Sequence, residues 1–387
     1  MAREMIPSTS PLVSPELLQK SGKVLFIAHL ALGDFTYLQN FFQAFAQAYP
    51  HLEVHLWVDE VRRTSKSAEW KYLKKYSLYD WVAGCPFFAK IYQRTYSPEL
   101  FRASIAEAQK ERYPIVVSLA TLRPHFYASL AREISPDGFV AGMKPRMKLF
   151  HLHHLLAYRK LDAGIAPDGG RGPEERHITD TYAGWFRQLF GLEVPPAERY
   201  PFVRIPEQWK RAAQDQLRQW EFPASGGKIV FINPYAKTEK RCWPLDKVAG
   251  LIKAMQELDA WRDACFIVNA VPQELENAGR MLGQYKLTRT QLFSAEENFF
   301  QLPALLQCCT LIISVETAVM HLANAVGVPV IALMRKKNPE WAPIDRDRST
   351  VITAARRRDW VREIPVERVV RELPDADSAA GRKRTGS

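Results

Sequence analysis

The stretch 311–333 reads LIISVETAVMHLANAVGVPVIAL and decides the fold class. It begins and ends with apolar runs, but polar or helix-breaking residues stand between them: Glu316, His321, Asn324, Gly327 and Pro329. A membrane-spanning helix needs about 20 predominantly apolar residues in a row. We therefore predict a buried strand, a helix and a second buried strand, which is the repeating unit of a parallel α/β sheet.

Working outward from this unit, the same alternation of apolar runs and helical spacing recurs in both halves of the chain. The expected strands are 23–30, 53–58, 115–119, 139–142, 228–233, 265–270, 310–314 and 328–333. The expected helices are 38–49, 180–190, 245–258, 272–282, 300–308, 317–326 and 359–373. We predict an α/β protein with two Rossmann-like domains, in which ligands bind beyond the carboxyl ends of the strands, in a cleft between the two sheets.

The length of 387 residues fits two domains at roughly 150 residues each. Four prolines in 194–206 indicate the linker. The predicted organisation is a flexible lead (1–20), an N-terminal Rossmann-like domain (21–205), a C-terminal Rossmann-like domain (206–355), a helix (356–374) and a disordered tail (375–387). We predict no regular element in the basic stretch 143–175.

The composition is that of a globular protein, with 47% hydrophobic residues and a formal net charge of +11. This charge favours an anionic partner, such as a phosphorylated substrate or an anionic membrane face. No nucleic-acid-binding motif occurs, so we expect no nucleic acid. Five cysteines without a C-x-x-C pattern and the absence of an apolar leader indicate a reducing, cytoplasmic location.

Gly33 and Asp34 follow the first apolar run and precede a helix. Asp is a favoured helix N-cap, but a carboxylate at the carboxyl end of a strand can also act as a general base. Gly33 would let a substrate approach the backbone closely. Asp34 is our candidate catalytic residue, and both of its roles stay open.

A basic turn, NPYAKTEKRCWP, follows the first apolar run of the second half. A run of charges is usually a solvated surface, yet Lys240 and Arg241 would suit a diphosphate at this edge of a sheet. Trp243 is expected to pack in the core.

The turn between the strand and the helix of 311–333 carries a further candidate site, formed by Glu316, Thr317, Ala318, Val319, Met320 and His321. The free N–H groups at a helix start bind phosphate without a metal ion. Glu316 could accept hydrogen bonds from ribose or sugar hydroxyls. Thr317 could simply cap the helix, and His321 is expected to pack rather than react.

Two patterns suggest metal ligands, and we reject both. Asp345-Arg346-Asp347 is a D-x-D in a charged loop, and His151, His153 and His154 have no carboxylate or Cys cluster nearby. G-x-G-x-x-G and the P-loop pattern are absent from the sequence, which argues against dinucleotide oxidoreductases and P-loop NTPases. We predict no metal and no cofactor.

The motifs together resemble glycosyltransferase family 9, the heptosyltransferases of the lipopolysaccharide inner core. Three segments of this chain carry the resemblance: Leu32-Gly33-Asp34; Asn233-Pro234 with Lys240-Arg241-Cys242-Trp243-Pro244; and 316–329, ETAVMHLANAVGVP. The third is similar to the family pattern D-[ST]-G-x-x-H-x-A-x-A-x-G-x-P. Three residues depart from the family: Glu316 for Asp, Ala318 for Gly, and Arg335 where Gly is common.

The resemblance implies a GT-B fold, with the acceptor bound by the N-terminal domain and ADP-heptose by the C-terminal domain. It implies inverting, metal-independent transfer in which Asp34 is the base, Lys240 and Arg241 bind the donor, and residues 317–320 form the phosphate-binding turn. The acceptor would be a lipid-linked saccharide, reached by peripheral attachment to the anionic inner membrane face.

Three other functions stay open at this point. The chain could be a related transferase acting on another glycan or a protein, a non-catalytic nucleotide-sugar-binding protein, or a nucleotide-sugar epimerase of similar fold. Turnover with and without an acceptor distinguishes them.

Overall fold

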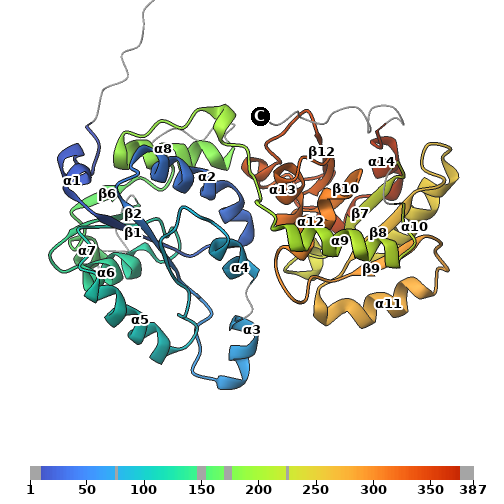
Figure 1. Cartoon of the computed structure of the whole chain (residues 1–387). Helices are drawn as coiled ribbons and strands as arrows, with labels where there is room; N and C mark the ends of the chain where they lie inside the picture. The colour runs from blue at the N-terminus through green and yellow to red at the C-terminus, as the bar shows by residue number, and fades with distance from the viewer. Residues whose placement is uncertain (1–9, 75–76, 146–153, 170–176, 224–225, 375–387) are drawn as a thin grey trace, which may run out of the picture. The chain divides into compact units, whose positions relative to one another are not determined.

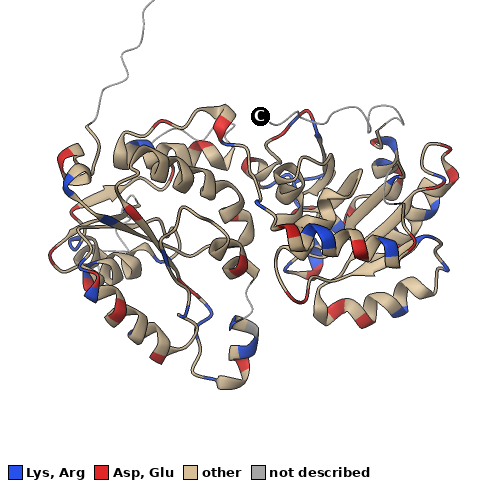
Figure 2. Cartoon of the chain, viewed as in Figure 1, with Lys and Arg blue, Asp and Glu red and all other residues tan. Residues whose placement is uncertain are grey.

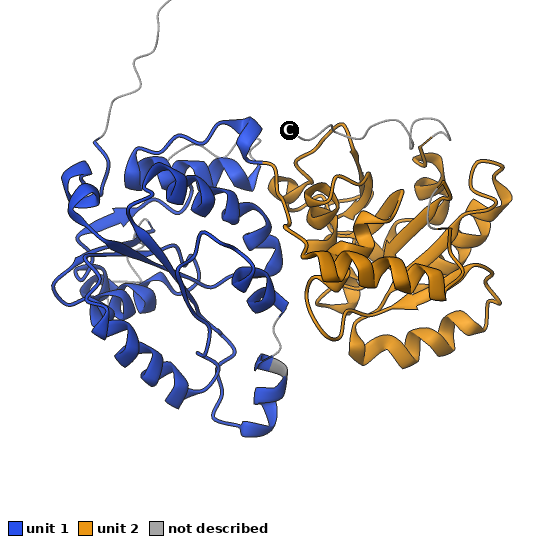
Figure 3. Ribbon diagram, in the orientation of Figure 1, with its two compact units in different colours: residues 1–199 blue, residues 200–387 orange. Residues whose placement is uncertain are grey.

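The computed structural model describes residues 10–74, 77–145, 154–169, 177–223 and 226–374. The chain divides into two compact units, residues 1–199 and 200–387 (Figure 3). The division falls between Arg199 and Tyr200, inside the proline-rich stretch 194–206.

Unit 1 contains a six-stranded sheet in the order β3-β2-β1-β4-β5-β6, and its neighbouring strands β1 and β2 are labelled in Figure 1. All neighbouring strands in it pair in parallel. The strands are β1 (Lys23–Ala28), β2 (Glu53–Val58), β3 (Lys90–Tyr92), β4 (Ile115–Ser118), β5 (Phe139–Met143) and β6 (Ala163–Ile165). The helices are α1 (Pro15–Lys20), α2 (Leu32–Ala48), α3 (Trp70–Lys74), α4 (Ser77–Ala83), α5 (Pro98–Lys110), α6 (Pro124–Ile134), α7 (Leu155–Tyr158) and α8 (Ile178–Phe190).

Unit 2 contains a second six-stranded parallel sheet, in the order β12-β11-β10-β7-β8-β9. The strands are β7 (Ile229–Asn233), β8 (Cys265–Asn269), β9 (Thr290–Phe293), β10 (Leu311–Val315), β11 (Val330–Met334) and β12 (Ser349–Thr353). The helices are α9 (Glu207–Gln219), α10 (Leu245–Glu257), α11 (Leu275–Gly283), α12 (Gln301–Gln307), α13 (Ala318–Ala325) and α14 (Val366–Arg371). Single 3-10 turns lie at Ser67–Glu69, Pro196–Glu198, Glu239–Arg241, Pro272–Glu274, Pro339–Trp341 and Val361–Glu363.

The two sheets share one topology. Each begins with a central strand, β1 or β7, adds two strands on one side and then three on the other. This is the Rossmann strand order, in which the direction of winding reverses between the first and fourth strands. The predicted class, α/β with two Rossmann-like domains, is confirmed.

Apolar strands and aromatic side chains hold each sheet to its helices. In unit 1, the ring of Phe26 on β1 contacts Phe42 and Phe45 of α2 and Phe186 and Phe190 of α8, with ring centroids 5.1 to 6.0 Å apart. In unit 2, Trp243 is 1% exposed and its indole N–H donates to the carbonyl of Ile364 at 3.0 Å. Trp243 is therefore a core residue, as predicted.

The sequence prediction misses edge strands and misplaces several ends. β3, β6, β9 and β12 were not predicted because they are short or only half-buried and carry no continuous apolar run. β6 and α7 lie inside 143–175, where no regular element was expected. The helix expected over 359–373 is reduced to α14 and a 3-10 turn, because Pro365 has no N–H with which to continue a helix.

The first described residues are bound to unit 1 rather than forming a flexible lead. Ser14 caps α1 by accepting from the N–H of Leu17 at 3.2 Å. The N–H groups of Leu12 and Val13 donate to carbonyls at the end of α8, at 2.9 Å each. Residues 1–9 and the predicted tail 375–387 lie outside the described residues.

None of the helices in the described part of the chain is both long enough and apolar enough to cross a membrane.

Candidate active site

Asp34 lies in the first turn of α2, directly beyond the carboxyl end of β1. Gly33 and Asp34 were predicted to precede the helix, but α2 already begins at Leu32, so both residues are helical. Ala31 is the N-cap, and its N–H donates to Asp34 Oδ2 at 3.0 Å. Asp34 is therefore not the N-cap itself. Its carboxylate reaches back to the cap residue from the third helical position, an arrangement that fixes its side chain.

The surroundings of Asp34 favour a carboxyl group that holds a proton more readily than usual. Burial raises the pKa of Asp34, and the hydrogen bond from Ala31 opposes this rise. The hydroxyl of Tyr182 on α8 donates to Asp34 Oδ1 at a long 3.5 Å. A half-buried carboxylate with a raised pKa is suited to accept a proton near neutral pH.

His29 is a residue that the sequence analysis did not select. It directly follows β1, its Nδ1 is buried without a hydrogen-bond partner among the described residues, and its ring stacks on that of Tyr127 at 6.1 Å. Burial lowers the pKa of His29, and the carboxylates of Asp34 and Asp59 oppose this effect. The charge of His29 in turn opposes the rise in the pKa of Asp34. The sequence offered one sign of His29: it is a titratable residue in the loop between the first strand and Asp34.

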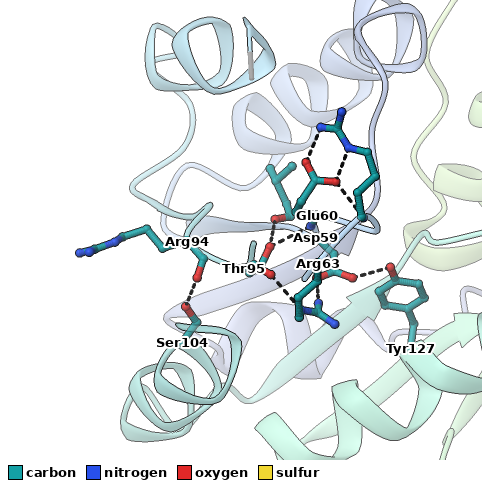
Figure 4. Close-up of polar contacts among 9 residues, drawn as sticks. Asp59, Glu60, Arg63, Arg94, Thr95, Ser104 and Tyr127 are labelled. Atoms are coloured by element: carbon teal, nitrogen blue, oxygen red, sulfur yellow. Dashed lines mark hydrogen bonds and ion pairs between the residues drawn. The ribbon is translucent and has the colours of Figure 1, made fainter. Parts of the chain in front are cut away.

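A buried ion pair at the end of β2 fixes Tyr127, whose ring stacks on that of His29. Figure 4 shows the polar contacts of Tyr127, Asp59 and Arg63. The hydroxyl of Tyr127 donates to Asp59 Oδ2 at 2.7 Å, and Arg63 donates to Asp59 Oδ1. Arg63 also donates from Nε to the carbonyl of Thr95 at 2.8 Å, and its guanidinium lies over the ring of Phe101. These contacts hold the loop after β2 in place and fix the ring on which His29 stacks.

In unit 2, a network of amides and hydroxyls joins the ends of β7, β8 and β10. Asn233 Nδ2 donates to Ser314 Oγ at 3.1 Å and to Thr317 Oγ1 at 2.9 Å. Asn269 donates to Asn233 Oδ1 at 2.8 Å. Thr317 occupies the N-cap position of α13, but its side chain makes no capping bond. The hydroxyl of Thr317 instead anchors the turn to β7.

Glu316, next to that turn, is buried and accepts four hydrogen bonds. Oε1 accepts from Arg241 Nη2 at 3.0 Å and from Asn338 Nδ2 at 3.1 Å. Oε2 accepts from the backbone N–H and the Nε of Arg335, both at 3.4 Å. These bonds occupy both carboxylate oxygens, and the predicted bonds from ribose or sugar hydroxyls to Glu316 stay a prediction.

The basic turn contributes two cations of different character. Arg241 ends the 3-10 turn Glu239–Arg241, and its Nε is buried without a partner among the described residues. Lys240 is exposed, and its ammonium lies 5.8 Å from the ring centroid of Trp360. Arg241 thus joins Glu316 and Arg335 in one cluster, while Lys240 lies at its rim.

The residues at the start of α13 differ in burial: the first two lie partly at the surface and the next three pack in the interior. Thr317 and Ala318 are half-buried, whereas Val319, Met320 and His321 are at most 6% exposed. The ring of His321 lies 6.0 Å from that of Trp341. His321 is therefore packed in the interior. The first N–H groups of α13 have no acceptor within the helix, so this end can bind an anion.

The structure describes one of the two rejected metal patterns in full and the other only in part. Within the described ranges, no group of three or more His, Cys, Asp or Glu side chains could hold a metal ion. His154 stacks on His125, with ring centroids 3.7 Å apart, and His151 and His153 lie outside the described residues. Asp347 is exposed, and the N–H of Asp345 donates to Asn324 at 3.0 Å.

The chain is similar to known proteins in its sequence and in its fold. The family model "Glycosyltransferase family 9 (heptosyltransferase)" matches residues 122–363. A glycosyltransferase family 9 structure from Veillonella parvula is 16% identical, with a TM-score of 0.67 over 92% of this chain and 97% of that chain. No curated protein matches the sequence.

Two Escherichia coli structures are also similar to this chain. ADP-heptose lps heptosyltransferase II is 17% identical, with a TM-score of 0.65 over 92% of this chain and 98% of that one. Heptosyltransferase WaaC with ADP is 15% identical, with a TM-score of 0.61 over 92% and 99%. These matches support the two-domain fold.

We predict that Tyr182→Phe raises the pKa of Asp34 further, because the ionised carboxylate loses a hydrogen-bond donor. The titration midpoint of the Asp34 carboxyl carbon, followed by NMR in selectively labelled protein, should move to higher pH by roughly half a pH unit to one pH unit. Tyr49→Phe is the matched control, since the Tyr49 hydroxyl donates to the carbonyl of Phe190 instead. An unchanged or lower midpoint in Tyr182→Phe would show that the hydroxyl does not act on Asp34.

Proposed function

Because the chain belongs to glycosyltransferase family 9, we propose that this glycosyltransferase moves a heptose from ADP-heptose to a lipopolysaccharide inner-core acceptor. One similar structure is an ADP-heptose transferase and another holds ADP, which supports the choice of donor. In this proposal unit 1 binds the acceptor and unit 2 binds the nucleotide sugar.

The observation that carries the proposal is Asp34 with its raised pKa, at the end of β1 where the sheet of unit 1 reverses its winding. Asp34 takes the proton of the acceptor hydroxyl as that oxygen forms its bond to the anomeric carbon. The bond from that carbon to the diphosphate oxygen breaks, and its electron pair leaves with the diphosphate. A single displacement of this kind inverts the anomeric carbon.

The leaving diphosphate gains negative charge in this step, and unit 2 has cationic groups to stabilise it. Arg241 and Lys240 come from the basic turn after β7, and the N–H groups at Thr317 and Ala318 begin α13. Charge that is already positioned for the transition state is commonly the largest single contribution to catalysis. With these groups, the proposed reaction needs no metal ion.

The first test is turnover of ADP-heptose and its loss in Asp34→Asn. The amide keeps the size of the side chain but cannot accept the proton, so we expect turnover to fall by ~10²–10⁴. Release of ADP in the presence of an inner-core acceptor measures it. Asp137→Asn is the control, because Asp137 is an exposed aspartate of the same unit. If Asp34→Asn turned over as the wild type does, Asp34 would not be the base.

The second test concerns the metal. We expect turnover to persist in excess EDTA, because Arg241, Lys240 and the start of α13 stabilise the diphosphate. Asp347→Asn should also leave the rate unchanged. Loss of turnover on chelation, restored by Mg²⁺ or Mn²⁺ and abolished in Asp347→Asn, would instead assign a metal to the D-x-D loop.

We also propose that the enzyme works in the cytoplasm and associates peripherally with the anionic inner membrane face, where a lipid-linked acceptor is presented. The net charge of +11 supports this association. Lys and Arg are spread over both units and interspersed with Asp and Glu, so any attraction is diffuse (Figure 2). Diffuse attraction between surfaces is screened within a Debye length of about 8 Å at physiological ionic strength.

Vesicle sedimentation tests this association. We expect the protein to bind vesicles that contain anionic phosphatidylglycerol at low salt and to leave them at about 1 M salt, where the Debye length falls to about 3 Å. Neutral phosphatidylcholine vesicles are the control and should not bind it. Binding to neutral vesicles that survives high salt would point to apolar insertion, and no binding to either would remove the membrane from the proposal.

A further inference from the structure

Glu316 is a buried carboxylate held by two arginines from different loops. Its side chain is 5% exposed and forms ion pairs with Arg241 at 3.0 Å and with Arg335 at 3.4 Å. One carboxylate neutralises only one of two guanidinium groups, so this cluster carries an excess positive charge. Asn338 completes the hydrogen bonding of the carboxylate without adding charge.

Arg335 directly follows β11 and lies beside Glu316, because β11 pairs with β10 in parallel and Leu333 aligns with Val315. Its side chain is 13% exposed, and its guanidinium carbon lies 5.1 Å from the ring centroid of Trp360. Only its backbone N–H and Nε donate to Glu316. Among the described residues, Nη1 and Nη2 of Arg335 meet no acceptor, which leaves the outer edge of the guanidinium unused.

Arg241 has donors to spare as well. Its Nη2 reaches both the side chain and the carbonyl of Glu316, at 3.0 and 3.4 Å. Its Nε is buried and has no partner within the described ranges. A buried donor without a partner is costly, so the bonds to Glu316 leave the guanidinium of Arg241 incompletely satisfied. Thr317 and Ala318 bring the first N–H groups of α13 to the same edge, next to Glu316 in sequence.

We infer that Arg335 is a further donor-binding residue, a second guanidinium for the diphosphate, and that Glu316 is the positioning residue that holds Arg241 and Arg335 side by side. This inference rests on the proposed function, since it assigns the diphosphate of the nucleotide sugar to this cluster. Two guanidinium groups repel one another unless a counter-charge separates them, and Glu316 supplies that charge from the interior. The flat ring of Trp360 supports Arg335 on another side.

Arg335→Met tests the binding role, with ADP and inorganic pyrophosphate as the probes. Methionine keeps much of the length and packing of arginine but has no charge and no donors. We expect the affinity for both probes, measured by calorimetry, to fall by roughly 10- to 100-fold, the range for hydrogen bonds to a charged group. Arg335→Lys, which keeps the charge, should lose less, and it serves as the second variant if Arg335→Met does not fold.

Arg357→Met is the matched control, because Arg357 is an exposed cation in the loop that follows β12 of the same unit. Its loss should change either affinity by less than about threefold, as expected for a screened surface charge. The inference is overturned if Arg335→Met binds both probes as the wild type does, or if Arg357→Met loses as much affinity as Arg335→Met.

Glu316→Gln tests the positioning role through the sign of its effect. The substitution removes a negative charge, so electrostatics alone would strengthen the binding of pyrophosphate. Positioning predicts the opposite, because the two guanidinium groups lose their common anchor, and we expect the affinity to fall at least fivefold. Glu316→Asp keeps the charge on a shorter side chain and should be intermediate. Equal or tighter binding by folded Glu316→Gln would remove the positioning role.

These probes separate the inference from the function on which it rests. Pyrophosphate carries neither base nor sugar, so its binding does not depend on heptose or on the acceptor. If the wild type binds ADP and pyrophosphate but does not turn over ADP-heptose, the substrate assignment is wrong and the diphosphate cluster stands. If ADP-heptose is turned over and Arg335→Met changes neither the affinity for ADP nor the KM, the inference alone is wrong.

Discussion

The parallel pairing of the first strand of each unit with the fourth is the constraint on which both candidate sites depend. β1 lies between β2 and β4, and β7 lies between β8 and β10. The winding of the sheet reverses at this position, so the loops that follow the two strands turn away from each other and leave room for a ligand. Asp34 follows β1, and Glu316 and Thr317 follow β10. Both candidate sites therefore lie beyond the carboxyl ends of the central strands of their sheets.

Each unit buries a carboxylate beyond the carboxyl ends of its strands. In each unit, an ion pair with arginine offsets the cost of removing that carboxylate from water. In unit 1, Asp59 is paired with Arg63 and bonded by Tyr127. In unit 2, Glu316 is paired with Arg241 and Arg335. The two clusters differ in the number of arginines that pair with each carboxylate. Among the described residues of unit 1, Arg63 alone pairs with Asp59, and its Nε donates to the carbonyl of Thr95. In unit 2 two arginines share one carboxylate, so that cluster carries a net positive charge and the cluster of Asp59 and Arg63 does not.

The sequence predicts the centre of each sheet and misses its edges, for physical reasons. β1, β4, β7, β8, β10 and β11 are buried on both faces and therefore read as apolar runs. β9 is half-buried throughout and leaves no such pattern. Asp34 was correctly predicted to lie at the end of β1, but its bond to Ala31 depends on where α2 begins, and sequence patterns fix helix ends to within only a few residues. The pairing of Glu316 with Arg335 joins residues 19 positions apart, and only the register of β10 and β11 brings them together.

The pairing of Glu316 with Arg335 also links two of the positions at which this chain departs from the family pattern. Members of the family commonly carry Asp where this chain has Glu316, and Gly where it has Arg335. A Gly at 335 has no side chain to donate, so a buried Glu316 would lose the bond from Nε and one of its two counter-charges. An aspartate at 316 would keep the negative charge between Arg241 and Arg335 but is shorter than Glu316 by one methylene group, and the contact of Glu316 with Arg335 Nε is already long at 3.4 Å. The longer carboxylate at 316 and the arginine at 335 are therefore matched to one another, and we interpret the two departures as one paired change.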